Sequence, residues 1–240
     1  MALDEALLLT PPPADRPVTV RYYGWDPDTL SLGYFQQVAD VPGAAAFLGD
    51  PVPEGTHRPG ALVRRLTGGG AIHHRHELTF SITAGADHPV YRGPVATSYE
   101  RVHAALAAAL ERAGARAIPR AEDRTAGELL SERDGTGMCF HHSSPVDLVW
   151  DGKKGVGSAQ RRTGGRVLHH GSIKLGATEL DTGVAGLDLA SPAELAPLVT
   201  HALETFFDVR LEAGVPTPEE AERAHERAPF FRTEAFLRRR

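Results

Sequence analysis

Residues 146–173 read VDLVWDGKKGVGSAQRRTGGRVLHHGSI and contain three strand candidates in close succession, at 146–150, 155–161 and 166–173. The dipeptides Asp151-Gly152 and Gly164-Gly165 separate these candidates. Both are strong signals for two-residue hairpin turns, because such residues tolerate the positive φ that these turns require. The stretch therefore predicts an antiparallel meander.

Further strands are expected upstream of the meander. The stretches 18–24 and 30–36 alternate in hydrophobicity and are expected to pair with each other across Asp26-Pro27-Asp28. The stretches 62–65 and 77–83 are expected to bracket a glycine-rich turn. Residues 51–60 are rich in proline and glycine, which predicts a surface loop.

Helices are expected at 2–9, 95–113 and 191–207, with shorter helical pieces near 217–227 and 233–239. Apolar residues recur at helical spacing in 95–113, and Gly114 is placed to stop that helix. Strands and helices come in blocks, which favours an α+β fold with a mixed or antiparallel sheet flanked by helices. We find no internal repeat and no interdomain linker, so 1–240 is expected to be a single domain.

The composition is that of a globular protein. The chain has 240 residues, 41% hydrophobic and 24% charged, with a net charge of −5. That charge gives no general affinity for nucleic acid. No apolar run approaches the roughly 20 residues that span a bilayer, and no signal peptide is visible. A single cysteine excludes an internal disulfide. We therefore expect a cytoplasmic protein with neither nucleic acid nor membrane as partner.

The glycine-rich turn belongs to the sequence RRLTGGGAIHH, residues 64–74. Three consecutive glycines make a flexible turn, or they let backbone amides approach a ligand closely. The flanking Arg64 and Arg65 favour a ligand that is anionic or rich in oxygen. Because neighbouring residues on a strand point to opposite faces, only one of the two arginines can reach it.

The only cysteine, Cys139, lies one hairpin away from Lys153 and Lys154. A thiol beside an ammonium group is a way to make a nucleophile, because the positive charge favours the thiolate. There are two plainer interpretations: the cysteine is a small buried hydrophobic residue, and the two lysines lie on a solvated hairpin. The glycines and small residues at 155–159 favour the functional interpretation, because they leave room for a flat or linear ligand beside the strand.

Histidine doublets occur at 73–74, 141–142 and 169–170. Each doublet could offer one ligand to a zinc ion if it lies on a strand. The chain lacks a His-Glu-x-x-His spacing and a carboxylate placed as a general base, so we expect no metal. Histidines that pack, hydrogen-bond or contact a bound acyl group are the alternative.

Taken together, these motifs resemble the lipoate–protein ligase and octanoyltransferase superfamily, whose fold is shared with the biotin–protein ligases. The similar segments are 1–8, 29–36, 64–74, 77–82, 151–162 and 168–173. The resemblance implies an acyl chain lying in a tunnel beside the glycine-rich loop. It also implies that Lys154 is the functional lysine and that Lys153 faces solvent. The implied substrate-binding residues are Arg65, Thr67, Gly68, Gly69, Gly70, Ala71, His74, Gly157, Ser158, Ala159, His170 and Gly171.

Two chemistries compete within this superfamily. An octanoyltransferase would move an octanoyl or lipoyl group from acyl carrier protein onto Cys139 and then to a lysine of a lipoyl carrier domain, without a cofactor. A lipoate ligase would use ATP and magnesium and pass through lipoyl-AMP. Cys139-Phe140, followed by Asp147-Leu148 and Lys154, resembles the transferases. A non-catalytic acyl-binding protein with this fold is a third possibility.

Other features divide between the two chemistries. His76-Glu77 stands where ligases often have Gly-Asn, and a chain of 240 residues is short for the C-terminal accessory domain of the large ligases. Both favour the transferase, whereas Gly70 makes a triple glycine of the kind found in ligases. Family members usually have a strand before the first helix, whereas this sequence begins at the helix, which would mean either a missing edge strand or a start site assigned too late. The loop signature of the biotin ligases is not visible.

For the transferase, the resemblance implies specific roles. Cys139 would be the nucleophile, and Lys154 would favour the thiolate and hold the substrate carbonyl. Backbone amides near 69–71, or at Ser158 and Ala159, would stabilise the tetrahedral oxyanion. The arginines at 161–162 and 238–240 are candidates to face the acidic hairpin of the lipoyl carrier domain. Solubilising surface charge is the alternative, above all for 238–240.

Overall fold

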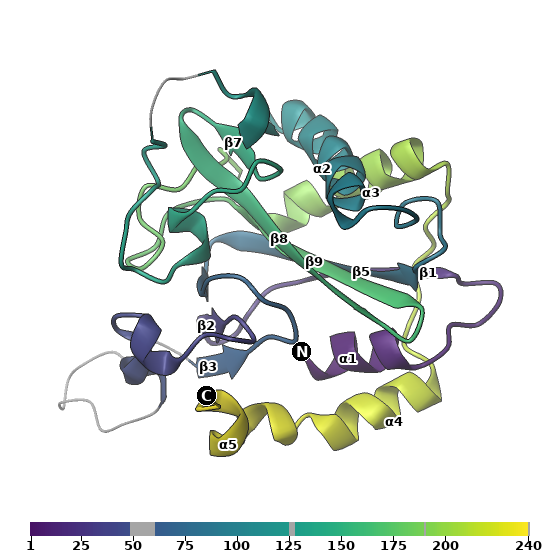
Figure 1. Cartoon of the computed structure of the whole chain (residues 1–240). Coiled ribbons are helices and arrows are strands. Elements are labelled where there is room, and N and C mark those ends of the chain that lie inside the picture. Colours follow the sequence, from purple (N-terminus) through teal and green to yellow (C-terminus); the bar gives the residue numbers. More distant parts are fainter. Residues whose placement is uncertain (49–60, 125–127, 190, 240) are drawn as a thin grey trace.

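A computed structural model describes residues 1–48, 61–124, 128–189 and 191–239 (Figure 1). The loop expected at 51–60 lies outside the described residues. One sheet has the order β1-β5-β9-β8-β7-β6, with every neighbouring pair antiparallel. A second sheet has the order β3-β2-β4, in which β2 runs parallel to β3 and antiparallel to β4. The strands are β1 (Val18–Tyr23), β2 (Thr29–Leu32), β3 (Ala61–Arg64), β4 (Ile72–His74), β5 (Glu77–Gly85), β6 (Ile118–Pro119), β7 (Leu148–Trp150), β8 (Lys153–Thr163) and β9 (Arg166–Lys174).

The predicted meander is confirmed as β7, β8 and β9. Asp151 and Gly152 in the first turn have φ values of 51° and 67°, and Gly164 and Gly165 in the second have 54° and 71°. Two central residues with positive φ match the right-handed twist of the flanking strands. These four residues therefore set the pairing register locally, which is why the sequence could predict it.

The pairing expected between 18–24 and 30–36 is wrong. β1 pairs with β5, whereas β2 joins the second sheet and ends at Leu32. The chain turns after this point, with the Gln36 amide donating to the Gly33 carbonyl. Gly33 packs on the glycine-rich loop, where a Cβ would lie 1.9 Å from the carbonyl oxygen of Gly69. Strand β4, inside the stretch expected to be only a turn, is too short for alternation to reveal it.

Two helices cover one face of the larger sheet, α2 (Val95–Arg112) and α3 (Pro192–Phe207) (Figure 1). Val102, Leu106 and Leu110 give α2 a buried apolar stripe, and residues of α3 and of β5, β8 and β9 complete this core. Gly114 has a φ of +89°, so the predicted helix stop is confirmed. Hydrophobic residues at helical spacing thus form the stripe of α2 that packs in this core.

The opposite face of the larger sheet meets the smaller sheet and α1 (Ala2–Leu9). The buried carboxylate of Asp4 accepts hydrogen bonds from Arg21, Tyr23 and Ser81, which ties α1 to β1 and β5. The helix α4 (Pro218–Arg227) packs along α1, and Arg227 forms an ion pair with Glu5.

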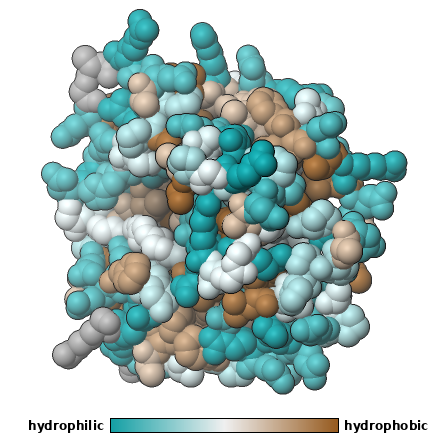
Figure 2. All heavy atoms as spheres, turned by 45° about the vertical axis from the view of Figure 1, so that its right-hand side comes forward, coloured by the Kyte–Doolittle hydropathy of each residue, from teal (hydrophilic) through white to brown (hydrophobic). Residues whose placement is uncertain are grey.

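The last helix, α5 (Glu234–Leu237), is shorter than the predicted piece at 233–239. It lies beside β3, where Arg64 donates hydrogen bonds to the carbonyls of Phe236 and Leu237. Short 3-10 helices occupy Val38–Asp40, Ala44–Leu48, Arg120–Glu122, Cys139–His141 and Phe230–Arg232. On the face seen in Figure 2, polar side chains alternate with small apolar areas. No helix among the described residues has the length and apolar character needed to cross a bilayer.

Candidate active site

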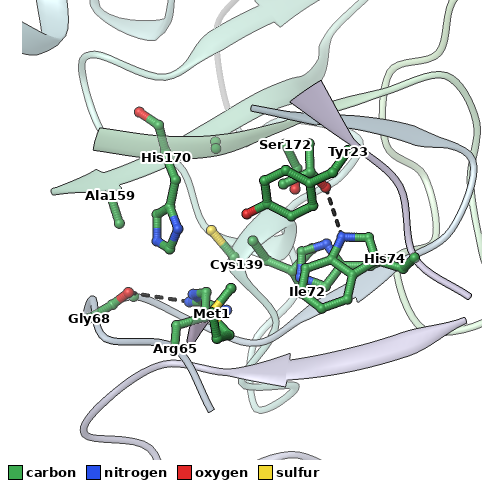
Figure 3. A pocket seen from close by; sticks show the side chains of 16 residues that line it. Met1, Tyr23, Arg65, Gly68, Ile72, His74, Cys139, Ala159, His170 and Ser172 are labelled. Atoms are coloured by element: carbon green, nitrogen blue, oxygen red, sulfur yellow. Dashed lines mark hydrogen bonds between the residues drawn. The ribbon is translucent and has the colours of Figure 1, made fainter. Parts of the chain in front are cut away.

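A pocket lies between the two sheets and encloses about 390 Å³ of empty space, its open mouth included. Figure 3 shows the sulfur of Cys139 pointing into it, with His170 and Ala159 on one side and Tyr23 on the other. The lining residues are Met1, Tyr23, Trp25, Arg65, Gly68, Gly69, Ile72, His74, Thr79, Cys139, Gly157, Ser158, Ala159, His170, Gly171 and Ser172.

The glycine-rich loop holds the turn that carries Cys139. The amide of Cys139 donates to the carbonyl of Ala71 at 2.7 Å, and the amide of Ala71 donates to Gly137 at 2.8 Å. A Cβ at Gly70 would lie 2.7 Å from the Cys139 nitrogen. Gly70 is therefore required for the backbone approach that places the thiol in the pocket.

Lys154 is buried directly beside the cysteine. Its Nζ lies 3.8 Å from Cys139 Sγ, 2.9 Å from the Cys139 carbonyl oxygen and 2.8 Å from that of His142. A third oxygen, Oδ2 of Asp147, lies at 2.8 Å. Since an ammonium group has three N–H bonds, these oxygens occupy all of them. A substrate carbonyl could reach Lys154 only in place of one of them.

The charge of Lys154 is held by its surroundings. Burial by itself would lower the pKa of Lys154, but Cys139 and Asp147 outweigh that effect and raise it. Asp147 is itself buried, and its Oδ2 also accepts a hydrogen bond from the Ser144 amide. In the sequence, Asp147 stands out only as part of the family resemblance, because no local pattern shows that it meets Lys154.

A hydrogen-bonded chain fixes the polar side chains in the pocket wall. His74 Nδ1 lies 2.6 Å from Glu77 Oε1, and His74 Nε2 lies 2.7 Å from Ser31 Oγ. Burial lowers the pKa of His74, so the ring is neutral. Its Nδ1 then donates to the carboxylate and its Nε2 accepts from Ser31. Arg65 donates to Ser31 Oγ and to the Gly70 carbonyl.

The polar groups of Thr79, Trp25 and Ser172, which also line the pocket, form hydrogen bonds within the pocket wall as well. Thr79 accepts a hydrogen bond from Trp25 Nε1 at 2.8 Å and donates to Glu77. Ser172 also donates to Glu77, at 2.8 Å. The Trp25 ring stacks on His74 with the ring centres 4.2 Å apart. Because these polar atoms bond to one another, the space they enclose is suited to an apolar ligand.

His170 stands at the other end of the glycine-rich loop. Its Nε2 lies 2.6 Å from Thr67 Oγ1, and burial lowers the pKa of His170 to about 3. The ring is therefore neutral at ordinary pH. Thr67 uses its hydroxyl for this contact and does not line the pocket.

Most of the predicted site residues come together, and one expected contribution is excluded. The residues that line the pocket are Arg65, Gly68, Gly69, His74, Cys139, Gly157, Ser158, Ala159, His170 and Gly171. Thr67, Gly70, Ala71 and Lys154 lie behind this lining. Ala71 cannot offer its amide to an oxyanion, because Gly137 already accepts that hydrogen bond. As expected, only one arginine of the pair 64–65 reaches the pocket.

The lining residues Met1, Tyr23, Trp25, Ile72, Thr79 and Ser172 were not identified from the sequence. Alternation could have placed Tyr23 on one face of its strand, but nothing local shows that this face meets the glycine-rich loop. Within the described part of the chain, no three histidine, cysteine or acidic side chains are arranged to hold a metal ion.

Residues 1–182 match the family model of the lipoyl protein ligase A/B catalytic domain. The chain is 40% identical over 221 residues to octanoyltransferase LipM of Moorella thermoacetica, which covers 90% of this chain and 76% of that protein. It is 33% identical over 252 residues to octanoyltransferase LipM of Kyrpidia tusciae, covering 94% and 89%. The Bacillus subtilis protein of that name is 37% identical over 183 residues, covering 75% and 62%.

Solved structures share the fold. A bi-partite lipoate protein ligase from Thermoplasma acidophilum superposes with a TM-score of 0.74 at 20% identity, covering 100% of this chain and 91% of that one. Lipoate-protein ligase A bound with ATP gives a TM-score of 0.74 at 21% identity, covering 98% and 91%. The match to the family model over residues 1–182 and the relatives at 33% and 40% identity show that the chain belongs to the lipoyl protein ligase A/B catalytic domain family.

Proposed function

We propose that this chain is an octanoyltransferase, which moves an octanoyl group from acyl carrier protein to a lysine of a lipoyl carrier domain by way of Cys139. Relatives 33% to 40% identical to it bear the name octanoyltransferase. The observation that carries the proposal is the position of Cys139 Sγ, in an apolar pocket and 3.8 Å from Lys154 Nζ.

The reaction has two steps that balance without ATP or another cofactor. In the first, the Cys139 thiolate attacks the carbonyl carbon of the carrier thioester. The carbon–sulfur bond to the carrier breaks, and the carrier thiolate takes up the proton that Cys139 lost. In the second, the acceptor amine attacks the Cys139 thioester, an amide forms, and the cysteine recovers a proton from that amine. Thioester exchange is close to isoenergetic, and amide formation is downhill.

Lys154 and Asp147 supply the electrostatics of this mechanism. The ammonium group of Lys154 lies against one carboxylate, that of Asp147, and two backbone carbonyl oxygens. The thiolate of Cys139 adds a second full negative charge to a cluster that is otherwise neutral overall. Asp147 thus positions Lys154, and Lys154 stabilises the thiolate.

The acyl chain is proposed to lie along β8, beside Gly157 and Ala159. A Cβ at Gly157 would lie 3.4 Å from Cys139 Sγ, so a glycine keeps this path open. The other residues proposed to contact the substrate are the remaining predicted ones that line the pocket, namely Arg65, Gly68, Gly69, His74, Ser158, His170 and Gly171. Amides at Gly69, Gly70 and Ser158 are the proposed oxyanion donors. The amide of Ala71 is bonded to Gly137, and that of Ala159 stands in a hydrogen-bonded pair with His170 in the β8–β9 ladder.

We also propose that residues 1–240 form one catalytic domain. The ion pair of Arg227 with Glu5 and the contact of Arg64 with Phe236 tie the C-terminal helices to N-terminal elements, which supports this proposal.

The test is mass spectrometry of the protein after incubation with octanoyl-carrier protein. We expect an adduct with the mass of one octanoyl group on the wild type, and octanoyl transfer to an apo lipoyl domain. Cys139→Ala should lose both by at least about a thousandfold while its melting temperature stays close to that of the wild type. Transfer at the normal rate by Cys139→Ala would refute the nucleophile.

The same preparation separates the two other functions. A lipoate ligase would release pyrophosphate when given lipoate, ATP and magnesium, and it would not need Cys139. A non-catalytic binding protein would bind octanoate without turnover. Pyrophosphate release by both the wild type and Cys139→Ala would replace the proposed function with the ligase reaction.

A further inference from the structure

We propose that Tyr34, Phe35, Arg161 and Arg239 form a docking surface for the acceptor protein, the one whose lysine receives the acyl group. This inference rests on the proposed function. We call the four residues the rim patch.

The rim patch borders the pocket mouth. Phe35 follows β2 and is 82% exposed, the most exposed of the large hydrophobic side chains in the described chain. Its Cδ2 lies 3.9 Å from the position of a Cβ on Gly68, which lines the pocket. Phe35 also packs edge-on against Tyr34, with the ring centres 5.0 Å apart. An exposed aromatic side chain at the edge of a pocket is typical of an interaction site.

Two guanidinium groups lie on Tyr34. The Cζ of Arg239 is 3.9 Å from the centre of the Tyr34 ring, and that of Arg161 is 5.4 Å from it. Arg161 also donates to the carbonyl of Leu66 at 2.9 Å, which fixes it beside the glycine-rich loop. The guanidinium of Arg239 lowers the pKa of Tyr34 through a hydrogen bond. The positive charge of the patch is therefore held in place by the protein itself.

Neither arginine has a carboxylate within ion-pair distance among the described residues. By contrast, Arg238 pairs with Glu234. Arg162 donates to Ser98 and Gln160 on the face that α2 covers. The structure thus narrows the sequence expectation for 161–162 and 238–240 to Arg161 and Arg239. Arg240 lies outside the described residues.

Distance favours the acceptor over the acyl donor as the occupant of the rim patch. The amine of an acceptor lysine ends about 6 Å from its own backbone, since it is carried on four methylene groups. The body of the acceptor must therefore come within a few ångströms of the pocket mouth to deliver the amine. A donor that carries its thioester on a long flexible arm does not have to do so.

The chemistry of the patch specifies the partner surface. Two unpaired guanidinium groups require carboxylates on the partner, close to its acceptor lysine, and Phe35 requires an apolar contact beside them. Such complementary charges steer association, so transfer should become slower as salt screens them.

The test uses the double variant Arg161→Glu/Arg239→Glu of the full chain. The enzyme is first octanoylated with a small thioester, octanoyl-N-acetylcysteamine, and then mixed with an apo lipoyl domain. We expect kcat/KM for transfer to the domain to fall at least tenfold, through KM, and to lose most of its salt dependence. Octanoylation by the small thioester should proceed at the wild-type rate, which also shows that the variant is folded.

Arg238→Glu is the matched control, because it reverses a neighbouring surface charge that already has a partner, and it should behave as the wild type. Arg239→Glu alone serves if the double variant is unfolded, because the ring contact and the hydrogen bond of Arg239 both go to the partly exposed Tyr34. It should still raise KM severalfold. Unchanged KM and salt dependence in the charge-reversed enzyme would refute the rim patch. The rim patch would also be refuted if the charge-reversed enzyme were octanoylated more slowly by octanoyl-carrier protein but still transferred the octanoyl group to the acceptor at the normal rate. If the wild type forms no octanoyl adduct, the proposed function fails instead.

Discussion

Two fully buried lysines lie on adjacent strands of this protein, and their surroundings differ by one negative charge. Lys174 on β9 contacts Glu77 at 2.8 Å and Asp181 at 3.0 Å. Within the described residues, Lys154 on β8 contacts one carboxylate, that of Asp147. Both ammonium groups lie within 5.5 Å of the centre of the Phe140 ring. The sulfur of Cys139 stands beside Lys154 where a second carboxylate stands beside Lys174.

We propose that this difference separates a structural ion cluster from a reactive one. The cluster around Lys174 is complete, with a net charge of −1, and its third N–H donates to the His73 carbonyl. The cluster around Lys154 reaches the same net charge only when Cys139 is a thiolate. A buried ammonium group that contacts a single carboxylate can therefore stabilise one more anion.

The largest expected effect is on stability, and it comes from the complete cluster. Lys174→Met should lower the free energy of unfolding by about 3–5 kcal/mol, because it leaves the carboxylates of Glu77 and Asp181 buried without their cation. Urea unfolding followed by circular dichroism measures this loss. Stability equal to that of the wild type would show that the Lys174 cluster is not a structural element.

The matched change in the other cluster should act mainly on rate. Lys154→Met is expected to slow octanoylation of Cys139 by about 10²–10³-fold, the usual effect of losing one preorganised charge in an active site. Its loss of stability should be smaller than that of Lys174→Met, since one carboxylate is left unpaired instead of two. Single-turnover mass spectrometry gives the rate, and a rate near that of the wild type would contradict the role of Lys154.

Removing the single carboxylate should have an intermediate effect. Asp147→Asn keeps a hydrogen-bond acceptor at this position but removes the charge that anchors Lys154. We expect the rate of octanoylation to fall by about 10–100-fold with binding of the acyl donor unchanged, so the loss should appear in kcat and not in KM. An equal loss in Glu234→Gln, a control on an exposed ion pair, would indicate an effect of net charge.

His170 is another buried basic group, and it is neutral, whereas the two buried lysines are charged. Burial holds the pKa of His170 at about 3, below its ordinary 6.5. The neutral form is therefore favoured by folding, and this stability is fully present above pH 6.5 and is lost as the pH falls toward 3. The loss is about 1.4 kcal/mol per pH unit for this one group. The free energy of unfolding, measured by urea at pH 6 and pH 5, should fall less steeply with pH in His170→Asn than in the wild type, by this amount. An unchanged pH dependence would contradict the lowered pKa of His170.

The smallest effect should come from steric pressure on the reactive cluster. A Cβ at Gly157 would lie 3.2 Å from Lys154 Cε and 3.4 Å from Cys139 Sγ, so Gly157→Ala should push the two groups apart by a few tenths of an ångström. We expect octanoylation to slow about three- to tenfold. Gly24→Ala is the control, because a Cβ there meets nothing within 4 Å. Equal rates in both variants would show that the spacing of sulfur and amine is not critical.

How far sequence could predict the fold depended on how local each signal is. The hairpins at 151–152 and 164–165 were predicted because the φ preference of their own residues sets the turn. The partner of β2 was predicted wrongly because pairing between strands is decided by the whole sheet. The same contrast holds in the site, where Cys139, Lys154 and the glycine-rich loop were found as motifs, whereas Asp147 was not singled out.

The amino-acid sequence by itself determined the family, the α+β fold class, the meander and most residues that line the pocket, because glycines, turns and a lone cysteine leave local patterns. Only the tertiary structure decided that Lys154 has one carboxylate and Lys174 two, that Ala71 gives its amide to Gly137, and that Arg161 and Arg239 meet on Tyr34. Charges, hydrogen bonds and ring contacts of this kind join residues far apart in the chain. Their energies depend on distance in space, which the order of residues does not contain.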